Sequence, residues 1–242
     1  SAKDDVSESK GNLYDESKNR QSNLYLNMAS GSTIEFWLKK DAFAATGGTR
    51  EIIFDLWNSG SVTEDIDAGE IYGRLNISCK HGSTALTFHH QSGSAKETGA
   101  GIDLETGLAS IADGAWHHYA ITAISSSTEG GLVTLHVDGK LASSSTFTTA
   151  YNEITGAMHA TIGAAVAQMP GAGGAEAGKG WGKLSGSIDE FRYWKKARTS
   201  RQIQRNWRGQ VNGGTNTDDA NTTLGVYYKF NEGITGTSSV DQ

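Results

Sequence analysis

Short runs in which apolar and polar residues alternate dominate the chain and predict β-strands. Residues 34–39 (IEFWLK) and 133–137 (VTLHV) alternate with period two, which places one set of side chains in a core and the other on the opposite face. The run at 50–57 (REIIFDLW) is typical of a strand buried on both faces. Clusters of Gly, Ser and Asn separate about ten such runs, a spacing typical of an all-β sandwich. The expected strands are 24–28, 34–39, 50–57, 71–79, 86–91, 116–124, 133–137, 158–163, 184–194 and 224–231.

One hairpin turn and one helix stand out between these strands. Asp138-Gly139 lies between two apolar flanks, where a tight hairpin turn requires positive φ. Thr199 and Gln202 have the spacing of a capping box and predict a short helix near the end of the chain. Ile203 and Trp207 are one helical turn apart, so we expect both to face a sheet.

Composition narrows the class of partner. The chain has 242 residues, enough for one large all-β domain or two small ones. Acidic residues outnumber basic ones by 27 to 21 and no Lys/Arg run stands out, so a nucleic-acid partner has little support. No apolar run approaches the ~18 residues of a membrane span, and no secretory signal is expected. The single cysteine, Cys79, lies in a strand pattern and is expected to be buried and inert.

Four local patterns, in the correct order, resemble the laminin-G-like, concanavalin A-like jelly-roll domains, a superfamily that includes the pentraxins. They are residues 32–39 (STIEFWLK), 113–122 (DGAWHHYAIT), 132–140 (LVTLHVDGK) and 186–203 (GSIDEFRYWKKARTSRQI). The resemblance implies an all-β, two-sheet antiparallel jelly-roll sandwich with one short C-terminal helix. It divides the chain into a polar lead-in at 1–22, a laminin-G-like domain at 23–231 and a tail at 232–242.

A fifth pattern occurs at an unexpected place. Residues 227–236 (YYKFNEGITG) resemble the opening of such a domain but come last in this chain. Either they close the sheet, or they begin a linker or a second copy in a longer protein. Strings of such domains resemble surface adhesins and the virion structural proteins of marine phages, so we expect an extracellular, cell-surface or virion location with neighbouring domains as partners.

Two places could hold a calcium ion. Asp189 and Glu190 are adjacent on an expected strand, so we expect their side chains to point to opposite faces and not to work as a catalytic pair. The resemblance implies that Asp189 either binds one structural Ca²⁺ or bonds backbone N–H groups. The acidic segment that contains Asp65 and Asp67 has a spacing loosely like that of calcium loops, with a solvated loop as the alternative.

The candidate ligand-binding residues are Trp57, Tyr72, His89 and Trp181. Trp181 ends a segment rich in Gly and Ala, where an exposed indole would stack on a pyranose ring; the alternative is a plug on the core. Trp57 leads into the acidic segment, Tyr72 follows it, and His89 would line a groove on the concave sheet unless it is a framework residue. The four tryptophans in strand or helix patterns are expected in the core: Trp37, Trp116, Trp194 and Trp207.

The sequence favours binding over catalysis. It contains no Gly-x-Ser-x-Gly elbow, and none of the expected strands carries the Glu-x-Asp-x-(x)-Glu pattern of the superfamily's glucanases. We expect a non-catalytic carbohydrate- or glycoconjugate-binding module, or adhesion module, of a larger surface or virion protein. One alternative is a structural spacer without a small ligand. The other is a glycoside hydrolase or lyase, which would need two carboxylates about 5–10 Å apart across a groove.

Overall fold

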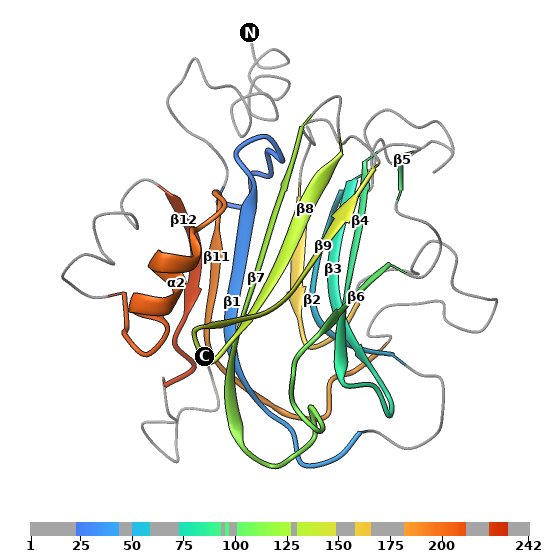
Figure 1. The fold of residues 1–242 in the computed structure, drawn as a ribbon, viewed down its shortest axis with the longest axis vertical. Coiled ribbons are helices and arrows are strands. Elements are labelled where there is room, and N and C mark those ends of the chain that lie inside the picture. The colour runs from blue at the N-terminus through green and yellow to red at the C-terminus, as the bar shows by residue number, and fades with distance from the viewer. Residues whose placement is uncertain are drawn as a thin grey trace, which may run out of the picture.

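The computed structural model of the chain describes residues 23–43, 50–58, 73–92, 95–96, 101–126, 130–148, 158–165, 182–211 and 223–231. Within these ranges two antiparallel β-sheets face each other, and one short helix lies outside them (Figure 1). The prediction of an all-β, two-sheet jelly-roll sandwich with one helix is confirmed.

The centre of sheet 1 joins strands that are distant in the sequence. Because β11 pairs with β1 and β1 pairs with β7, the middle of this sheet depends on long-range contacts. The spatial order is β12 (Leu224–Tyr228), β11 (Ser187–Trp194), β1 (Ser32–Lys39), β7 (Trp116–Ser125), β8 (Gly131–Val137) and β9 (Lys140–Phe147).

Sheet 2 is built around the consecutive strands β2, β3 and β4. At one edge β10 pairs with β2, and at the other edge both β5 and β6 pair with β4. The strands are β10 (His159–Ile162), β2 (Arg50–Asn58), β3 (Gly73–Lys80), β4 (Ala85–Ser92), β5 (Ala95–Lys96) and β6 (Ile102–Glu105).

The space between the sheets is filled by the apolar half of the alternating strand patterns. Cys79 belongs to this core, and burial raises the pKa of its thiol to about 12, so it is buried and unreactive as predicted. Fully buried members from both sheets include Ile34, Phe36, Leu56, Ile77, Phe88 and Ile121.

The helix α2 (Ser200–Asn206) covers the face of sheet 1 that points away from sheet 2 (Figure 1). Its capping box is present: Thr199 Oγ1 accepts the Gln202 N–H at 3.2 Å, and Gln202 Oε1 accepts the Thr199 N–H at 2.8 Å. Ile203 is fully buried and Trp207 stacks on Trp37 of β1 at 5.5 Å between ring centroids. Both residues face the sheet, as their spacing predicted.

The predicted strand at 24–28 is wrong, because only a single bridge forms at Leu26. Asn27 ends the extended segment. Its Oδ1 accepts the Ala29 N–H at 2.9 Å, and its carbonyl oxygen accepts the Gly31 N–H at 2.9 Å. An asparagine that bonds nearby backbone groups favours a turn over a strand.

Several strand boundaries in the structure differ from those predicted from the sequence. The strand β11 begins at Ser187, not at 184, and β12 ends at Tyr228, not at 231. The strands β5 and β6 lie between residues 92 and 112, where no strand is expected from the sequence. Residues 224–228 pair with β11 and close sheet 1 as an edge strand, which is one of the two alternatives for this segment.

Candidate ligand-binding site

Sheet 2 has a polar face opposite the core. Paired residues of antiparallel strands lie on the same face, so the register places Asp55, Asn76 and His89 in one row across β2, β3 and β4. The neighbouring row on this face begins with Trp57, which is paired with Arg74. Together with Ser78, Thr87, Gln91, Asp103, His159 and Thr161 these residues form what we call the polar face.

A buried ion pair lies at the centre of the polar face. Arg74 Nε and Nη2 each donate to one carboxylate oxygen of Asp55 at 2.8 Å, and both side chains are fully buried. Asn76 Nδ2 adds a third hydrogen bond to Asp55 Oδ1 at 3.2 Å. Bidentate pairing neutralises both charges and fixes the planes of both groups. The row is therefore rigid and carries little net charge.

Several polar atoms on the same face are buried without a partner. Trp57 Nε1, Asn76 Oδ1 and Ser78 Oγ have no hydrogen-bond partner among the described residues. Nearly all buried polar atoms in proteins are paired, so unpaired ones call for an explanation such as a ligand or a bound water. Here one donor, one acceptor and one hydroxyl lie buried and unpaired among the described residues on a single sheet face.

The structure brings together two of the four predicted ligand residues. Trp57 and His89 both lie on the polar face, Trp57 half-buried and His89 buried. The Trp57 ring lies 6.2 Å from that of the exposed His159, at the β10 edge. Tyr72 and Trp181, like the metal candidates Asp65 and Asp67, lie outside the described residues.

The two adjacent histidines of β4 separate as strand alternation requires. His89 lies on the polar face, whereas His90 points to the core and stacks over Phe88 at 6.3 Å between ring centroids. Burial, with a smaller contribution from His89, lowers the pKa of His90 to about 3. His90 is therefore neutral near pH 7 and acts as a core residue.

Asn76 and Ser78 were missed as candidates by the sequence reasoning, although a signal for them exists. In 74–79 (RLNISC) polar and apolar residues alternate strictly, so Arg74, Asn76 and Ser78 share the face opposite the core. The even alternation of a central strand with three polar residues is the mark of a polar sheet face.

Carboxylates of the polar face are occupied by neighbouring donors. Asp55 is held by Arg74, and Asp103 Oδ1 accepts the Thr87 hydroxyl at 2.7 Å. General acid–base catalysis of glycoside cleavage requires two carboxyl groups that can reach the substrate. This arrangement is better suited to binding than to acid–base chemistry.

Asp189 and Glu190 lie on sheet 1, where a β-bulge interrupts alternation. Glu190 has φ 50, and the β1–β11 register shifts so that Asp189 pairs with Trp37 while Arg192 pairs with Glu35. The bulge turns the Glu190 carboxylate towards Arg192 Nη2, at 2.8 Å. The expectation of strictly opposite faces therefore fails, because it assumed an unbroken strand.

The Glu190 carboxylate is fully engaged by donors. Besides Arg192 it accepts Gln210 Nε2 at 3.1 Å and the Tyr227 hydroxyl. Asp189 Oδ1 accepts the Glu190 backbone N–H at 2.8 Å. In the described ranges, no three His, Cys, Asp or Glu side chains converge as metal ligands, so Asp189 has no such partners there for calcium.

A buried charge cluster lies under the helix side of sheet 1. Glu35 accepts Arg198 Nη1 at 2.8 Å and Arg192 Nη1 at 3.5 Å, and His118 Nε2 lies 3.7 Å away. Burial alone would raise the pKa of Glu35. The nearby His118 imidazole and the charges of Arg198 and Arg192 outweigh burial and lower the pKa to about 2. This cluster attaches the segment that leads into α2 to the sheet.

The tryptophans predicted for the core have three different environments. Trp194 is fully buried. Trp37 and Trp207 stack on each other on the helix side of sheet 1 and are partly buried. Trp116 is 44% exposed, so its assignment to the core is wrong. It is the first residue of β7, opposite Lys39 at the end of β1, where little of the sheet extends past it.

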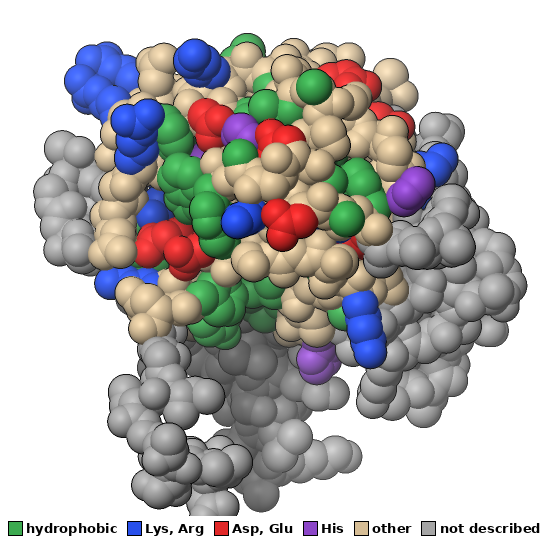
Figure 2. All heavy atoms as spheres, turned by 90° about the horizontal axis from the view of Figure 1, so that it is seen from below, with side chains coloured by type: hydrophobic (Ala, Val, Ile, Leu, Met, Phe, Trp, Pro, Cys, Tyr) green, Lys and Arg blue, Asp and Glu red, His purple; other side chains and the backbone are tan. Residues whose placement is uncertain are grey.

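At the end of the sandwich drawn at the bottom of Figure 1, the described residues form no patch of a single charge. Hydrophobic, basic and acidic side chains are mixed over it (Figure 2). The described helical segments include none that is long and apolar enough to cross a membrane.

Comparisons with known proteins agree with this fold. The laminin G-type family model of the concanavalin A-like lectin/glucanases superfamily matches residues 15–204. None of the curated protein sequences compared with the chain matches it.

Similar solved structures include the heptameric SAP-like pentraxin of Limulus polyphemus, at 16% identity and a TM-score of 0.44, with 74% of this chain and 70% of that one covered. A putative carbohydrate binding protein of Bacteroides ovatus is 17% identical, with a TM-score of 0.45 and coverage of 83% and 45%. Domains LG4-5 of the mouse laminin alpha1 chain are 11% identical, with a TM-score of 0.45 and coverage of 75% and 43%.

The match thus spans less than half of the Bacteroides and laminin chains. With its matching family model over residues 15–204 and its two-sheet sandwich, the chain belongs to the laminin G-like family of the concanavalin A-like lectin/glucanase superfamily.

Proposed function

We propose that the protein is a non-catalytic module that binds carbohydrate on the polar face of sheet 2. One observation carries this proposal: Trp57 Nε1, Asn76 Oδ1 and Ser78 Oγ are buried on one face without a partner among the described residues. Sugar hydroxyls both donate and accept hydrogen bonds, so they pair with such a mixed set. Trp57 adds an aromatic surface for the C–H side of a sugar ring.

The charge of the polar face favours an uncharged glycan. Arg74 is neutralised by Asp55, and Asp103 is held by Thr87, so the described part of this face offers no isolated cation for a sulfate or carboxylate group. An anionic sugar would lose hydration without gaining an ion pair. We therefore expect neutral saccharides as ligands.

The module would act within a larger cell-surface or virion protein. This part of the proposal rests on the resemblance of the chain to domains that occur in strings, since residues 224–228 close sheet 1 and residues 232–242 lie outside the described residues. The alternative, a spacer without a small ligand, has the same fold, so only binding measurements separate the two.

A glycan array followed by titration calorimetry tests the proposal. We expect Trp57→Ala to weaken binding of the best neutral glycan at least tenfold, and Trp57→Phe, which keeps a ring but loses the N–H, to weaken it less. The matched control is Trp116→Ala, which removes an exposed tryptophan from the other sheet and is expected to leave affinity unchanged.

Two outcomes of this experiment would contradict the proposal. An array without any signal at high micromolar concentration would favour the spacer. If glycan affinity falls equally in the Trp57→Ala and Trp116→Ala proteins, the glycan does not bind on the polar face.

Ser78→Ala separates binding from folding. Removing a buried hydroxyl that lacks a partner is expected to raise the free energy of unfolding, by about 1 kcal/mol, while glycan affinity falls. Urea denaturation and calorimetry on the same protein measure both quantities. A more stable variant with full affinity would exclude Ser78 from the site.

Calcium binding stays a prediction from the sequence. If Asp189, Asp65 or Asp67 holds an ion, a chelator will lower the melting temperature and added Ca²⁺ will restore it, because a ligand that binds only the native state stabilises it. Asp189→Asn and Asp65→Asn then identify the ligand. If neither chelator nor calcium changes the melting temperature, none of these three residues is a calcium ligand.

A further inference from the structure

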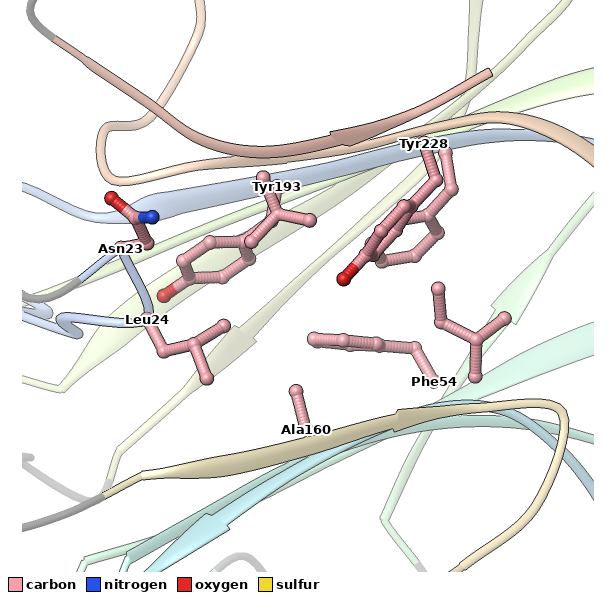
Figure 3. Close-up of a pocket in the computed structure, with 9 residues that line it drawn as sticks. Asn23, Leu24, Phe54, Ala160, Tyr193 and Tyr228 are labelled. Carbon is pink, nitrogen blue, oxygen red and sulfur yellow. The ribbon is translucent and has the colours of Figure 1, made fainter. Parts of the chain in front are cut away.

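A pocket lies on the open side of the sandwich, between the edge strands β10 and β12 (Figure 3). Its volume is about 470 Å³, within the range of about 300–1,000 Å³ typical of small-molecule sites. In the described residues β10 pairs only with β2 and β12 only with β11. Neither sheet therefore has a described strand that closes this side.

The walls of this pocket are apolar and come from both sheets. Figure 3 shows Tyr193 and Tyr228 projecting from one side, with Phe54 and Ala160 on the opposite side. The Phe54 ring centroid lies 5.0 Å from that of Phe191 and 6.0 Å from that of Tyr193. The remaining lining residues are Asn23, Leu24, Ile162 and Val226.

No charged side chain is among these lining residues. A charged group that entered the pocket would lose its hydration without a counter-charge, at a cost that excludes it. The hydroxyl of Tyr193 donates to the Tyr25 carbonyl oxygen at 3.0 Å, which fixes that ring as part of the wall. The amide of Asn23 and the phenol of Tyr228 are the polar groups of the lining that remain for a ligand.

Exposed aromatic surface continues outward from the pocket. Tyr228 is 53% exposed and stacks on Phe230, itself 49% exposed, at 5.9 Å between ring centroids. Large apolar side chains that remain exposed beside a hollow are typical of binding sites.

We propose that this pocket binds a small uncharged apolar ligand, such as an alkyl chain or a one- or two-ring aromatic group. The ligand packs against the Phe54 and Tyr193 rings, and any polar end it carries meets Asn23 or Tyr228. The site is separate from the polar face, because Ala160 and Ile162 point into the pocket while His159 and Thr161 lie on the other face of β10. It does not depend on the glycan proposal.

The test uses the full chain and N-phenyl-1-naphthylamine, an uncharged probe with a naphthyl and a phenyl group whose fluorescence rises in apolar surroundings. We expect saturable binding and displacement by 1-octanol. Ala160→Phe fills the pocket from an exposed position and is expected to weaken probe binding at least tenfold. The matched control Ala142→Phe, at an exposed position of β9 on the opposite edge of sheet 1, is expected to bind the probe as the unaltered protein does.

Three outcomes would overturn the proposal. The first is no saturable binding, and the second is equal affinity in the Ala160→Phe and Ala142→Phe proteins while both keep their circular dichroism spectra. The third concerns the apolar pair Leu13-Tyr14, which lies outside the described residues. If only a Leu13→Asn/Tyr14→Ser protein binds the probe, the chain's own lead-in occupies the pocket.

Discussion

Among the described residues, both sheets contain buried polar atoms with hydrogen-bond partners and buried polar atoms without them. Glu35 and Glu190 on sheet 1 are each held by several donors. On sheet 2, Asn76 and Ser78 keep unpaired oxygens, although both are almost completely buried. Saturated groups stabilise a fold, whereas unpaired ones reduce stability unless something binds them. The unpaired oxygens of Asn76 and Ser78 therefore lower stability unless a ligand such as the proposed glycan pairs with them.

His117 is a residue for which pH dependence can be predicted. Its Nδ1 lies 2.7 Å from Asp138 Oδ2 and its Nε2 lies 3.0 Å from Asp113 Oδ2. Partial burial lowers the pKa of His117, but the hydrogen bonds and charges of Asp138 and Asp113 outweigh it, so the pKa is raised overall. A histidine between two carboxylates is stabilised in its protonated form.

The raised pKa gives this stabilisation a defined sign. The contribution is fully present below about pH 6.5, the pKa of an unfolded histidine, and is lost as pH rises through the higher folded pKa. We expect the free energy of unfolding to fall between mildly acidic and mildly alkaline pH more steeply in the unaltered protein than in His117→Gln. Urea denaturation over this pH range measures the free energy of unfolding of both proteins. Parallel pH profiles of the two proteins would contradict the prediction.

Residue environments could be predicted only in part. The outward direction of His89 follows from local alternation. The exposure of Trp116 does not, because it depends on where the neighbouring strand β1 ends. The pairing of Arg74 with Asp55 also required the β2–β3 register, which no local pattern contains.

Among the elements, the β8–β9 hairpin and the turn after α2 form one packed unit. Asp138 and Gly139 have φ values of 50 and 74, the positive values that the predicted tight turn requires. A Cβ on Gly139 would lie 2.4 Å from Cδ1 of Trp207. Gly139 is therefore needed both for its backbone conformation and for the close approach of the indole.

Alanine substitutions of two glycines separate the cost of the backbone conformation from the cost of the contact with Trp207. Gly82 also has φ 74, but a Cβ there would meet nothing within 4 Å. We expect Gly82→Ala to lower the free energy of unfolding by about 1 kcal/mol, the cost of a side chain in a left-handed conformation. Gly139→Ala is expected to cost more than Gly82→Ala, because Trp207 must also move.

Urea denaturation of both alanine proteins measures the difference. Adding Trp207→Ala to Gly139→Ala provides the control, since the extra cost should shrink when the indole is absent. Equal losses for the two glycines would show that Trp207 does not constrain the turn.

Elements with local signals were predictable, and those that depend on pairing were not. The capping box of α2 and the Asp138-Gly139 turn each depend on residues that are close together in the sequence, and both are confirmed. The bulge at Glu190 arises because β11 carries one more residue than β1 needs between two paired positions. Such a mismatch appears only when both strands are aligned.

At the scale of the molecule, a buried ion pair joins the two sheets. Lys40 follows β1 of sheet 1, and its Nζ lies 2.6 Å from Oε2 of Glu51 in β2 of sheet 2. The same Nζ donates to the Ser185 carbonyl oxygen at 2.7 Å, and Glu51 Oε2 accepts the Ser185 N–H at 2.7 Å. This contact therefore fixes the beginning of β2 and the approach to β11 at one end of the sandwich.

Removing one partner of this pair is expected to destabilise the whole fold. Lys40→Met should lower the free energy of unfolding by about 3–5 kcal/mol, because it leaves the Glu51 carboxylate buried without its counter-charge. The double variant Lys40→Met/Glu51→Gln should regain part of this loss. Chemical denaturation of the two variants measures the effect, and a single variant as stable as the unaltered protein would contradict it.

The fold class was accessible from the sequence because four separate motifs, in order, each occupy a strand or turn of the sandwich. The order of strands in sheet 1 was not, since β1 pairs with β11 more than a hundred residues later. No local property of either strand selects that partner. It follows from the shape of the complete core.

The unpaired oxygens of Asn76 and Ser78 have a consequence for laboratory evolution. A library selected only for heat resistance would enrich apolar replacements at these two positions, because each relieves a desolvation cost. Such a population would gain melting temperature while its members lost their ligand. Under alternating selection for heat resistance and glycan capture, positions 76 and 78 should resist replacement while stabilising changes accumulate elsewhere.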